Sequence, residues 1–248
     1  MPDQFPHGVR GTALWSQVDA LLDRRAQEVG QAALDVLDVG GGSGVFAVPL
    51  AMRGHRVTVV DPSPNALATL KQRAAEAHVT SRVEAVQGDA ASLAMVVEVD
   101  SADVMLCHGV LEVVDDPQAA VAGIVACLRP AALASIVAAQ RNAAAIAKAV
   151  GGHLEEARHL LEDPDGRWGR SDPLPRRFSE VGLTDLLTNS GLVVDAVYGV
   201  RIFTDLVPGP LVDDATDVRA LAALEATAGR MPELRALAGA LHVTAIRE

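Results

Sequence analysis

An apolar stretch in the first quarter of the chain ends in an acid and four glycines. The residues from Val36 to Val39 are apolar apart from Asp38, and they are followed by Gly40, Gly41, Gly42 and Gly44. Glycine suits such a turn because it adopts dihedral angles that other residues avoid, and because it has no Cβ to hold a ligand away from the backbone. A buried strand that leads through a glycine turn into a helix is typical of a nucleotide site. We therefore expect this stretch to bind a nucleotide-like cofactor.

The spacing of the glycines separates the classes of nucleotide. The dinucleotide fingerprint needs glycine at its first, third and sixth positions, but the sixth position counted from Gly40 is Val45. No Gly-Lys-Ser/Thr follows, which excludes a phosphate-binding P-loop. The pattern Asp38-x-Gly40-x-Gly42-x-Gly44 resembles the first motif of the class I methyltransferases that use S-adenosylmethionine (SAM). A tight turn in another α/β protein and an NAD-dependent reductase are the alternatives.

Further polar residues stand at the ends of later predicted strands. Asp61 ends the second strand about 20 residues after the first glycine, where a carboxylate can accept hydrogen bonds from both ribose hydroxyls. The alternative role of Asp61, a helix cap, is already supplied by Ser63. Asp89 ends the third strand and His108 the fourth, next to the point where the strand order reverses. A purely structural histidine is the alternative for His108.

The elements that must position these residues alternate between strand and helix. Periodicity predicts strands over 36–39, 56–61, 82–87, 102–107 and 133–139, with helices over 12–26, 45–53, 64–77 and 118–128. Such alternation is typical of a parallel sheet with right-handed crossovers. Two more strands are expected over 192–203 and 241–246, and helices over 183–190 and from 214 to 228. The sequence thus predicts a single Rossmann-like α/β domain over residues 1–248. Its seven-stranded, mostly parallel sheet carries helices on both faces and an antiparallel C-terminal strand.

The regular alternation is interrupted between about residues 140 and 178. Two short helices are expected there, over 142–150 and 153–161, and a loop with glycine, proline and Trp168 follows them. This insert is the natural candidate for a lid or for substrate recognition.

Composition limits the partners and the compartment. The 248 residues include 21 Lys and Arg against 32 Asp and Glu, a net charge of −11 that gives no general attraction to nucleic acid or anionic membranes. Cys107 and Cys127 lie in apolar segments and are expected to be small buried hydrophobes in a reducing compartment, with no metal. The apolar stretch 121–139 is interrupted by Arg129-Pro130, which argues against a membrane span. We expect a cytoplasmic protein.

From His7 onward the chain resembles the small bacterial methyltransferases that include the tRNA 5-carboxymethoxyuridine methyltransferases. The shared stretches are Gly8-Val9-Arg10 with Leu14-Trp15, Arg53-Gly54-His55, His108-x-Val110-Leu111-Glu112, Gly199-Val200-Arg201-x-Phe203-x-Asp205 and His242-Val243-Thr244-Ala245. The resemblance implies that Arg10, Gly40 and Gly41 hold the methionyl part of SAM. It also implies that Asp61 holds the ribose, that Asp89 with Ala90 holds the adenine, and that His108 lies near the methyl group. The predicted cofactor-binding residues are Arg10, Asp38, Gly40, Gly41, Gly42, Gly44, Asp61, Asp89, Ala90 and His108.

The chain departs from this subfamily where a nucleic acid would be held. The family pattern has a lysine run in the insert, but residues 162–167 here are Glu-Asp-Pro-Asp-Gly-Arg. It also has an Arg-Tyr pair shortly before the final strand, where this chain has Gly239-Ala240, and a Pro-Gly-Gly where this chain has Pro130-Ala131-Ala132. We therefore favour a small-molecule or undefined acceptor, with carboxyl methylation of a modified wobble uridine in tRNA as the alternative. A SAM-binding protein without catalytic activity is a further alternative.

The nucleophile decides which residues the reaction needs. Methyl transfer from a sulfonium is an in-line displacement, so the enzyme mainly aligns the reactants and excludes water. An anionic acceptor could be held by Arg176, Arg177 or Arg201, of which Arg176 and Arg177 have surface charge as their alternative role. Arg201 and Trp15 are the predicted substrate residues. A hydroxylated acceptor would instead need a base, for which His108 and His242 are the candidates. The sequence leaves both options open.

Overall fold

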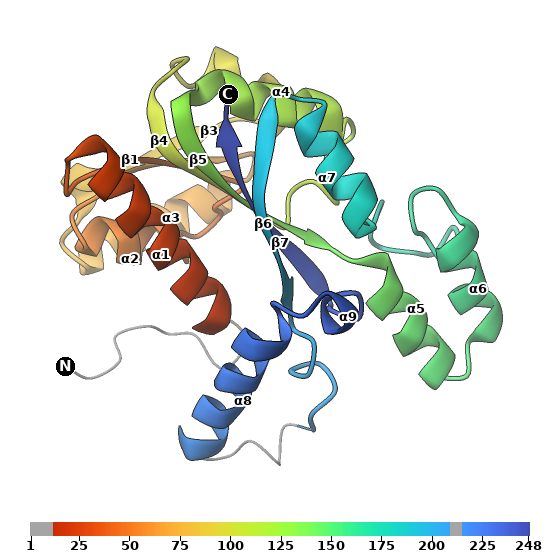
Figure 1. The fold of residues 1–248 in the computed structure, drawn as a ribbon. Coiled ribbons are helices and arrows are strands. Elements are labelled where there is room, and N and C mark those ends of the chain that lie inside the picture. The colour runs from red at the N-terminus through yellow and green to blue at the C-terminus, as the bar shows by residue number, and fades with distance from the viewer. Residues whose placement is uncertain (1–11, 209–214) are drawn as a thin grey trace. The chain divides into compact units, whose positions relative to one another are not determined.

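The computed structural model describes residues 12–208 and 215–248. In that part of the chain a seven-stranded sheet has the strand order β3-β2-β1-β4-β5-β7-β6 (Figure 1). The strands are β1 (Asp35–Val39), β2 (Arg56–Asp61), β3 (Val83–Gln87), β4 (Ala102–His108), β5 (Leu128–Ala139), β6 (Leu192–Val200) and β7 (Ala240–Arg247). This order and the antiparallel C-terminal strand confirm the predicted Rossmann-like sheet.

The centre of the sheet is parallel and buried. β1 pairs in parallel with β2 on one side and with β4 on the other, and β4 pairs in parallel with β5. Val36, Leu37 and Val39 are all buried, and so is β4 from Ala102 to Cys107. Strands covered on both faces need apolar side chains on both, which explains why these segments lack the alternation of a half-exposed strand.

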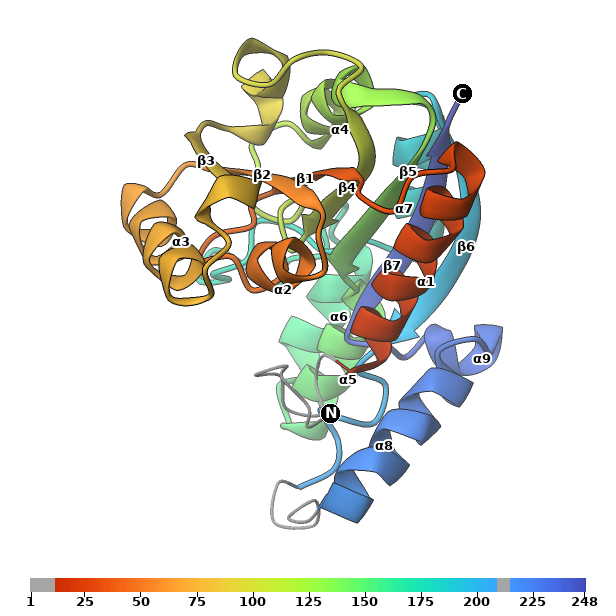
Figure 2. The ribbon, with the colours of Figure 1, turned by 90° about the vertical axis from the view of Figure 1, so that its left-hand side faces the viewer.

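Helices follow the strands as the periodicity predicts. They are α1 (Thr12–Val29), α2 (Ala47–Met52), α3 (Pro64–Glu76), α4 (Pro117–Cys127), α7 (Glu180–Thr188), α8 (Ala215–Ala228) and α9 (Pro232–Arg235). Around strands β1 to β3, α2 and α3 lie on one face of the sheet and α4 lies on the other (Figure 2). α3 and α4 begin with proline after a capping side chain: Ser63 accepts the N–H of Ala66, and Asp116 accepts that of Ala119.

The chain divides into two compact units. The sheet unit comprises Ala20–Val137, Thr184–Asp195 and Val243–Glu248, and the insert unit comprises Met1–Asp19, Ala138–Leu183 and Ala196–His242. The first contains the glycine turn, and the second contains the interrupted region and most of the C-terminal third. That both serve one functional domain stays a prediction.

Two strand boundaries differ from the sequence prediction. β5 begins at Leu128 and not at residue 133, because the chain at Arg129-Pro130 forms an irregularity within the strand and does not end it. Ala131 takes a φ of 58° there. β6 ends at Val200 and not at residue 203, because Arg201 turns into the left-handed region with a φ of 61°.

The insert consists of two helices and a loop. α5 (Arg141–Val150) and α6 (Leu154–Glu162) pack side by side (Figure 1). In the loop that follows, the guanidinium of Arg177 donates to both carboxylate oxygens of Asp172, at 2.7 and 3.1 Å, and both side chains are buried. Asp172 also accepts the backbone N–H groups of Trp168 and Leu174. The loop is therefore fixed internally by a buried ion pair; its function as a lid stays a prediction.

Candidate functional site

The glycine turn follows β1 and has the backbone that only glycine adopts easily. Gly40, Gly42 and Gly44 have φ values of 69°, 55° and 77°. A Cβ on Gly41 would lie 2.3 Å from Oδ2 of Asp38, so the turn passes directly over that carboxylate. The expected helix over 45–53 is shorter than predicted, since the turn continues to Phe46 and α2 begins at Ala47.

Asp38 is a buried acid with no cation paired to it among the described residues. Asp38 is 3% exposed, and its Oδ2 has no hydrogen-bond partner within the described residues. Burial raises the pKa of Asp38 to about 7, and the nearby carboxylate of Asp61 adds to the shift. An unpaired carboxyl in the interior is costly, so a positively charged ligand beside it would relieve that cost.

Asp61 and Asp89 both hold backbone amides at the ends of their strands. Asp61 accepts the N–H of Gly42 at 3.0 Å and that of Ser63 at 2.8 Å, which ties the glycine turn to the end of β2. Asp89 accepts the N–H of Ala91 at 2.8 Å and caps a short 3-10 helix. A carboxylate has about four acceptor positions, so Asp61 keeps capacity for hydroxyl donors of a ligand.

A cavity of about 290 Å³ lies at the carboxyl ends of the first four strands. It is lined by Val39, Gly40, Val60, Asp61, Pro62, Gly88, Asp89, Ala90, Gly109, Val110, Val113, Val114 and Asp115. The structure thus brings together Gly40, Asp61, Asp89 and Ala90, which the sequence analysis had taken from three separate strand ends. Sequence analysis missed the residues after β4, of which Val110, Val113 and Val114 give the cavity an apolar wall. The sequence signal that could have identified these residues is the run of apolar side chains that follows His108.

His108 is half-buried, and it is not among the described residues that line this cavity. Its Nε2 lies 2.8 Å from the hydroxyl of Ser135, and the ring of Phe46 meets it edge-on at 4.8 Å between centroids. Burial lowers the pKa of His108 to about 3, so the ring is neutral at physiological pH.

Comparison with known proteins identifies the family to which this chain belongs. Residues 37–136, from the middle of β1 into β5, match the model of the "Methyltransferase domain" family. The chain is 29% identical over 197 residues to the Escherichia coli K12 tRNA 5-carboxymethoxyuridine methyltransferase, covering 79% of this chain and 72% of the relative. The chain belongs to the class I SAM-dependent methyltransferases. Its cofactor is SAM, as the sequence analysis predicted.

Other relatives of this methyltransferase act on different acceptors. The ubiquinone biosynthesis O-methyltransferase of Xanthomonas axonopodis pv. citri is 31% identical over 171 residues, or 68% of this chain and 66% of the relative. A SAM-dependent methyltransferase structure from Methanosarcina mazei has a TM-score of 0.59 at 21% identity, covering 88% of this chain and 93% of that one. Magnesium protoporphyrin IX methyltransferase of Synechocystis, solved with bound SAH, has a TM-score of 0.62 at 14% identity, with coverages of 97% and 86%. These structures support the fold of the methyltransferase and leave its acceptor open.

The residues of the sheet unit suit SAM in charge and shape. When bound, SAM would supply a methyl group on a positively charged sulfonium, whose sulfur leaves as a neutral thioether. We infer that Asp38 and Asp61 favour this cation, since Asp38 has a buried oxygen with no hydrogen-bond partner among the described residues and Asp61 lines the cavity. Asp61 and Asp89 would accept from the ribose and the adenine. Arg10, predicted to hold the cofactor carboxylate, lies outside the described residues.

The other predicted residues belong to the insert unit. His242 on β7 is fully buried, with its Nδ1 2.6 Å from Oε1 of Gln17 and its ring stacked on Tyr198 at 5.8 Å. Trp15 on α1 is 7% exposed. Arg201 lies just after β6 with a partly exposed guanidinium. The substrate role of Arg201 and Trp15 and the catalytic role of His242 stay predictions.

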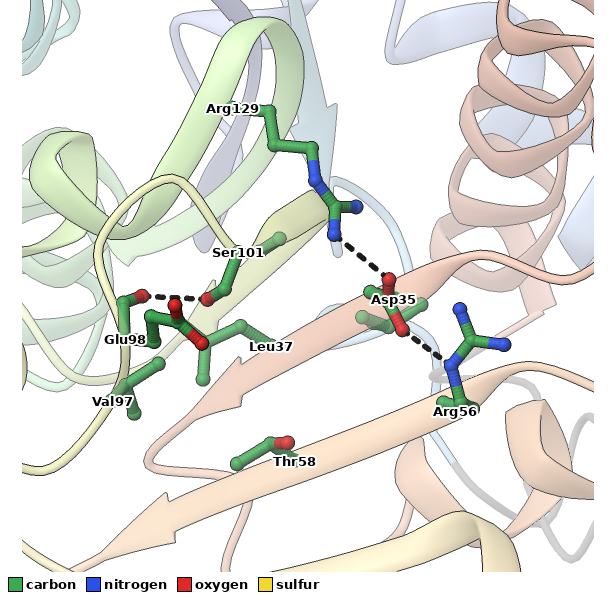
Figure 3. Close-up of a pocket in the computed structure, with 10 residues that line it drawn as sticks. Asp35, Leu37, Arg56, Thr58, Val97, Glu98, Ser101 and Arg129 are labelled. Atoms are coloured by element: carbon green, nitrogen blue, oxygen red, sulfur yellow. Dashed lines mark hydrogen bonds and ion pairs between the residues drawn. The ribbon is translucent and has the colours of Figure 1, made fainter.

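A second cavity, of about 270 Å³, lies at the opposite, amino-terminal ends of β1 and β2 (Figure 3). Asp35 accepts from Arg56 at 2.6 Å and from Arg129 at 3.0 Å, as the dashed lines in Figure 3 show. Arg129 also lies 2.7 Å from Asp103. Burial raises the pKa of Asp35, but the two arginines outweigh it and the net shift is downward. These charges neutralise one another, and we assign this cavity a structural role.

Neither a metal site nor a membrane-spanning helix is found among the described residues. Residues 12–208 and 215–248 contain no group of three His, Cys, Asp or Glu side chains placed to hold a metal ion. Within those ranges no helix is long and apolar enough to cross a bilayer. Cys107 and Cys127 are free and buried, as predicted.

Two glycines of the turn provide a matched pair for testing the cofactor site. Alanine at Gly42 or Gly44 costs about 1–2 kcal/mol of backbone strain, because both have positive φ. The added Cβ meets nothing closer than 3.7 Å at Gly42, but it lies 2.3 Å from Cδ1 of Leu70 at Gly44. We expect Gly42→Ala to weaken SAM binding by about tenfold or more with little further loss of stability. Gly44→Ala should cost about 1–3 kcal/mol beyond the strain. Calorimetric titration and thermal unfolding would measure both; wild-type SAM affinity in Gly42→Ala would place the cofactor elsewhere.

Replacing Asp61 with alanine tests the ribose assignment. We expect the SAM affinity to fall by about 100-fold, equivalent to about 3 kcal/mol, because charged hydrogen bonds to the ligand and the anchor of Gly42 are lost together. Asp61→Asn keeps one acceptor oxygen and should lose less. Calorimetric titration with SAM gives both affinities, and an unchanged value in Asp61→Ala would refute the assignment.

Proposed function

We propose that this methyltransferase transfers the methyl group of SAM to an oxygen of a small-molecule acceptor, and that this oxygen belongs to a carboxylate. The observation that carries the proposal is the position of His108: its Nε2 lies 2.8 Å from the hydroxyl of Ser135, its ring packs against Phe46, and it is not among the described residues that line the cavity. A general base works best with a pKa near the operating pH, and burial lowers the pKa of this histidine to about 3. A carboxylate nucleophile is already ionised at neutral pH and needs no base.

Arg201 supports an anionic acceptor. Of the arginines that the sequence analysis considered, Arg177 donates to Asp172 and to the carbonyl of Gly166 and has few donors to spare. Arg201 lies 3.6 Å from Asp205, too far for a good hydrogen bond, and its side chain is 39% exposed. We infer that its guanidinium binds the acceptor anion, for which its planar pair of donors is suited.

Carboxyl methylation of a wobble uridine in tRNA is the second candidate. It is favoured by the similarity to the Escherichia coli tRNA 5-carboxymethoxyuridine methyltransferase. Against it stands the charge pairing of the insert. Lys148 lies 2.5 Å from Glu156, and Arg158 lies 2.9 Å from Glu155 and 2.5 Å from Glu162. Cations already paired with acids have less to offer to phosphates, whose neutralisation by Lys and Arg dominates nucleic-acid binding.

An acceptor screen tests the proposal. Purified protein would be incubated with SAM carrying a tritiated methyl group. The acceptors would be total tRNA and the anionic and neutral fractions of a metabolite extract. We expect label in the anionic fraction that alkali releases as methanol, because methyl esters hydrolyse and methyl ethers do not. Alkali-stable label would refute a carboxylate acceptor. Alkali-labile label confined to tRNA would favour the second candidate.

A further inference from the structure

The turn after β6 is held in an unusual conformation. β6 ends at Val200, and Arg201 then takes a φ of 61°, a region that residues other than glycine seldom occupy. Such a conformation persists only where the surroundings enforce it. Ile202 contributes to this, since it is 3% exposed and packs against Ala228 and Ala238.

A single buried carboxylate accepts hydrogen bonds from several donors of this turn. Glu225 on α8 is 4% exposed. Its Oε2 accepts the N–H of Ile202 at 3.0 Å, and its Oε1 accepts the N–H of Phe203 at 2.8 Å and that of Thr204 at 2.7 Å. The hydroxyl of Thr204 donates to the same oxygen at 2.7 Å. Successive amides that converge on one anion form a rigid cradle, so Glu225 fixes the three residues that follow Arg201.

The side chain of Arg201 lies over a glycine. A Cβ on Gly239 would come within 3.2 Å of Nη2 of Arg201 and 3.0 Å of Oδ2 of Asp205. The backbone N–H of Gly239 donates to the carbonyl oxygen of Arg201 at 3.2 Å. Within the described residues the guanidinium donates no hydrogen bond, and its ion pair with Asp205 is long, at 3.6 Å. The donors of Arg201 thus remain available although its backbone is fixed.

We propose that Glu225 is a positioning residue for acceptor binding: by fixing the turn 202–204, it presents the guanidinium of Arg201 to the carboxylate of the methyl acceptor. This inference rests on the anionic acceptor proposed above. Glu225 itself does not touch the acceptor and acts through Arg201. This role would explain why a buried acid 21 or more residues away in sequence accepts the hydrogen bonds of this turn.

A double-mutant cycle separates positioning from simple stabilisation. The variants are Glu225→Gln, Arg201→Gln and the two combined, with Thr204→Val as a milder change that removes one donor to Glu225. Glu233→Gln on α9 is the matched control, because that glutamate is exposed. The measurements are the half-saturating dilution of the anionic metabolite fraction, the maximal methylation rate and the calorimetric affinity for SAM.

We expect Glu225→Gln to raise the half-saturating amount of acceptor by about tenfold, with the maximal rate and SAM affinity nearly unchanged. In the Arg201→Gln background the same change should add less than about twofold, because the residue it positions is gone. Thr204→Val should give a smaller rise in the same direction, which keeps the test valid if Glu225→Gln folds poorly.

Three other results would overturn the inference. Additive losses in the combined variant, or loss of SAM affinity in parallel, would show that Glu225 only stabilises the fold. Normal acceptor saturation in Arg201→Gln, with methylation of the anionic fraction intact, would remove Arg201 as the anion contact but leave the carboxylate acceptor standing. Absence of alkali-labile methylation of any anionic fraction would refute the proposed function itself, and the role of Glu225 with it.

Discussion

Replacing Asp38 with asparagine is expected to remove a pH-dependent destabilisation of the cofactor-free protein. Burial raises the pKa of Asp38 from 3.8 to about 7, so the folded state holds this proton over a pH range in which the unfolded state has lost it. Stability from this group is therefore fully present below about pH 4, and it is lost as the pH rises to about 7. The whole effect is at most about 4 kcal/mol, at 1.36 kcal/mol for each unit of pKa shift.

The measurement is the free energy of unfolding of both proteins from pH 4 to pH 8 without SAM. The difference between Asp38→Asn and wild type should move in favour of the variant by about 2–4 kcal/mol across this range. A buried amide without partners has its own cost, but that cost is the same at every pH. Asp185→Asn, at an exposed position on α7, is the control and should show no such trend. A constant difference would mean that Asp38 titrates normally.

The same variant should bind SAM more weakly. A cationic cofactor favours the ionised form of Asp38, so wild-type affinity is expected to rise between pH 6 and pH 8, with release of up to one proton per SAM bound. Asp38→Asn should lose about tenfold or more at pH 8 and show a flatter pH profile. Titrations in buffers of different ionisation enthalpy would count the proton. Equal affinity of the two proteins would exclude Asp38 from the cofactor site.

Removing Arg177 is expected to have the largest effect on the stability of the insert. The loss should be about 3–5 kcal/mol, because Asp172 would remain as an uncompensated buried charge. The stacking of the guanidinium over Trp168, at 4.5 Å from the ring centroid, would be lost as well. Urea unfolding of Arg177→Ala measures the total, and amide exchange of residues 163–178 shows whether the loss is local.

Arg158→Ala is the matched control for Arg177→Ala. Arg158 pairs with Glu155 and Glu162 on the same insert but is exposed, so its removal should cost at most about 1 kcal/mol. Burial alone would raise the pKa of Asp172, but the hydrogen bonds from Arg177, Trp168 and Leu174 outweigh it and lower the pKa. The contribution of the pair is therefore present above about pH 4 and is lost as the pH falls further. Similar losses for both arginines would show that the ion pair of Arg177 is not effectively buried.

Sequence alone determined the fold and predicted which residues meet at the carboxyl edge of the sheet. Strand and helix periods are local properties, and parallel strands joined by helices put their carboxyl ends at one edge. Gly40, Asp61 and Asp89 could therefore be assigned to one site from their positions in the chain, and a common cavity includes all three. The family followed from the alternation of glycines after Asp38, because a turn that binds a particular ligand needs glycine at particular positions.

Tertiary structure decided the chemical state of these residues. Nothing in the spacing of His108 or Asp38 shows that burial makes the first a weak base and the second a weak acid, because burial depends on what the rest of the chain packs against them. The hydrogen bonds of Glu225 to the turn after Arg201 are equally absent from any local pattern, since α8 and this turn come together only in the folded chain. Periodicity records which side of an element faces inward, but hydrogen-bond partners and desolvation are set by contacts between distant segments.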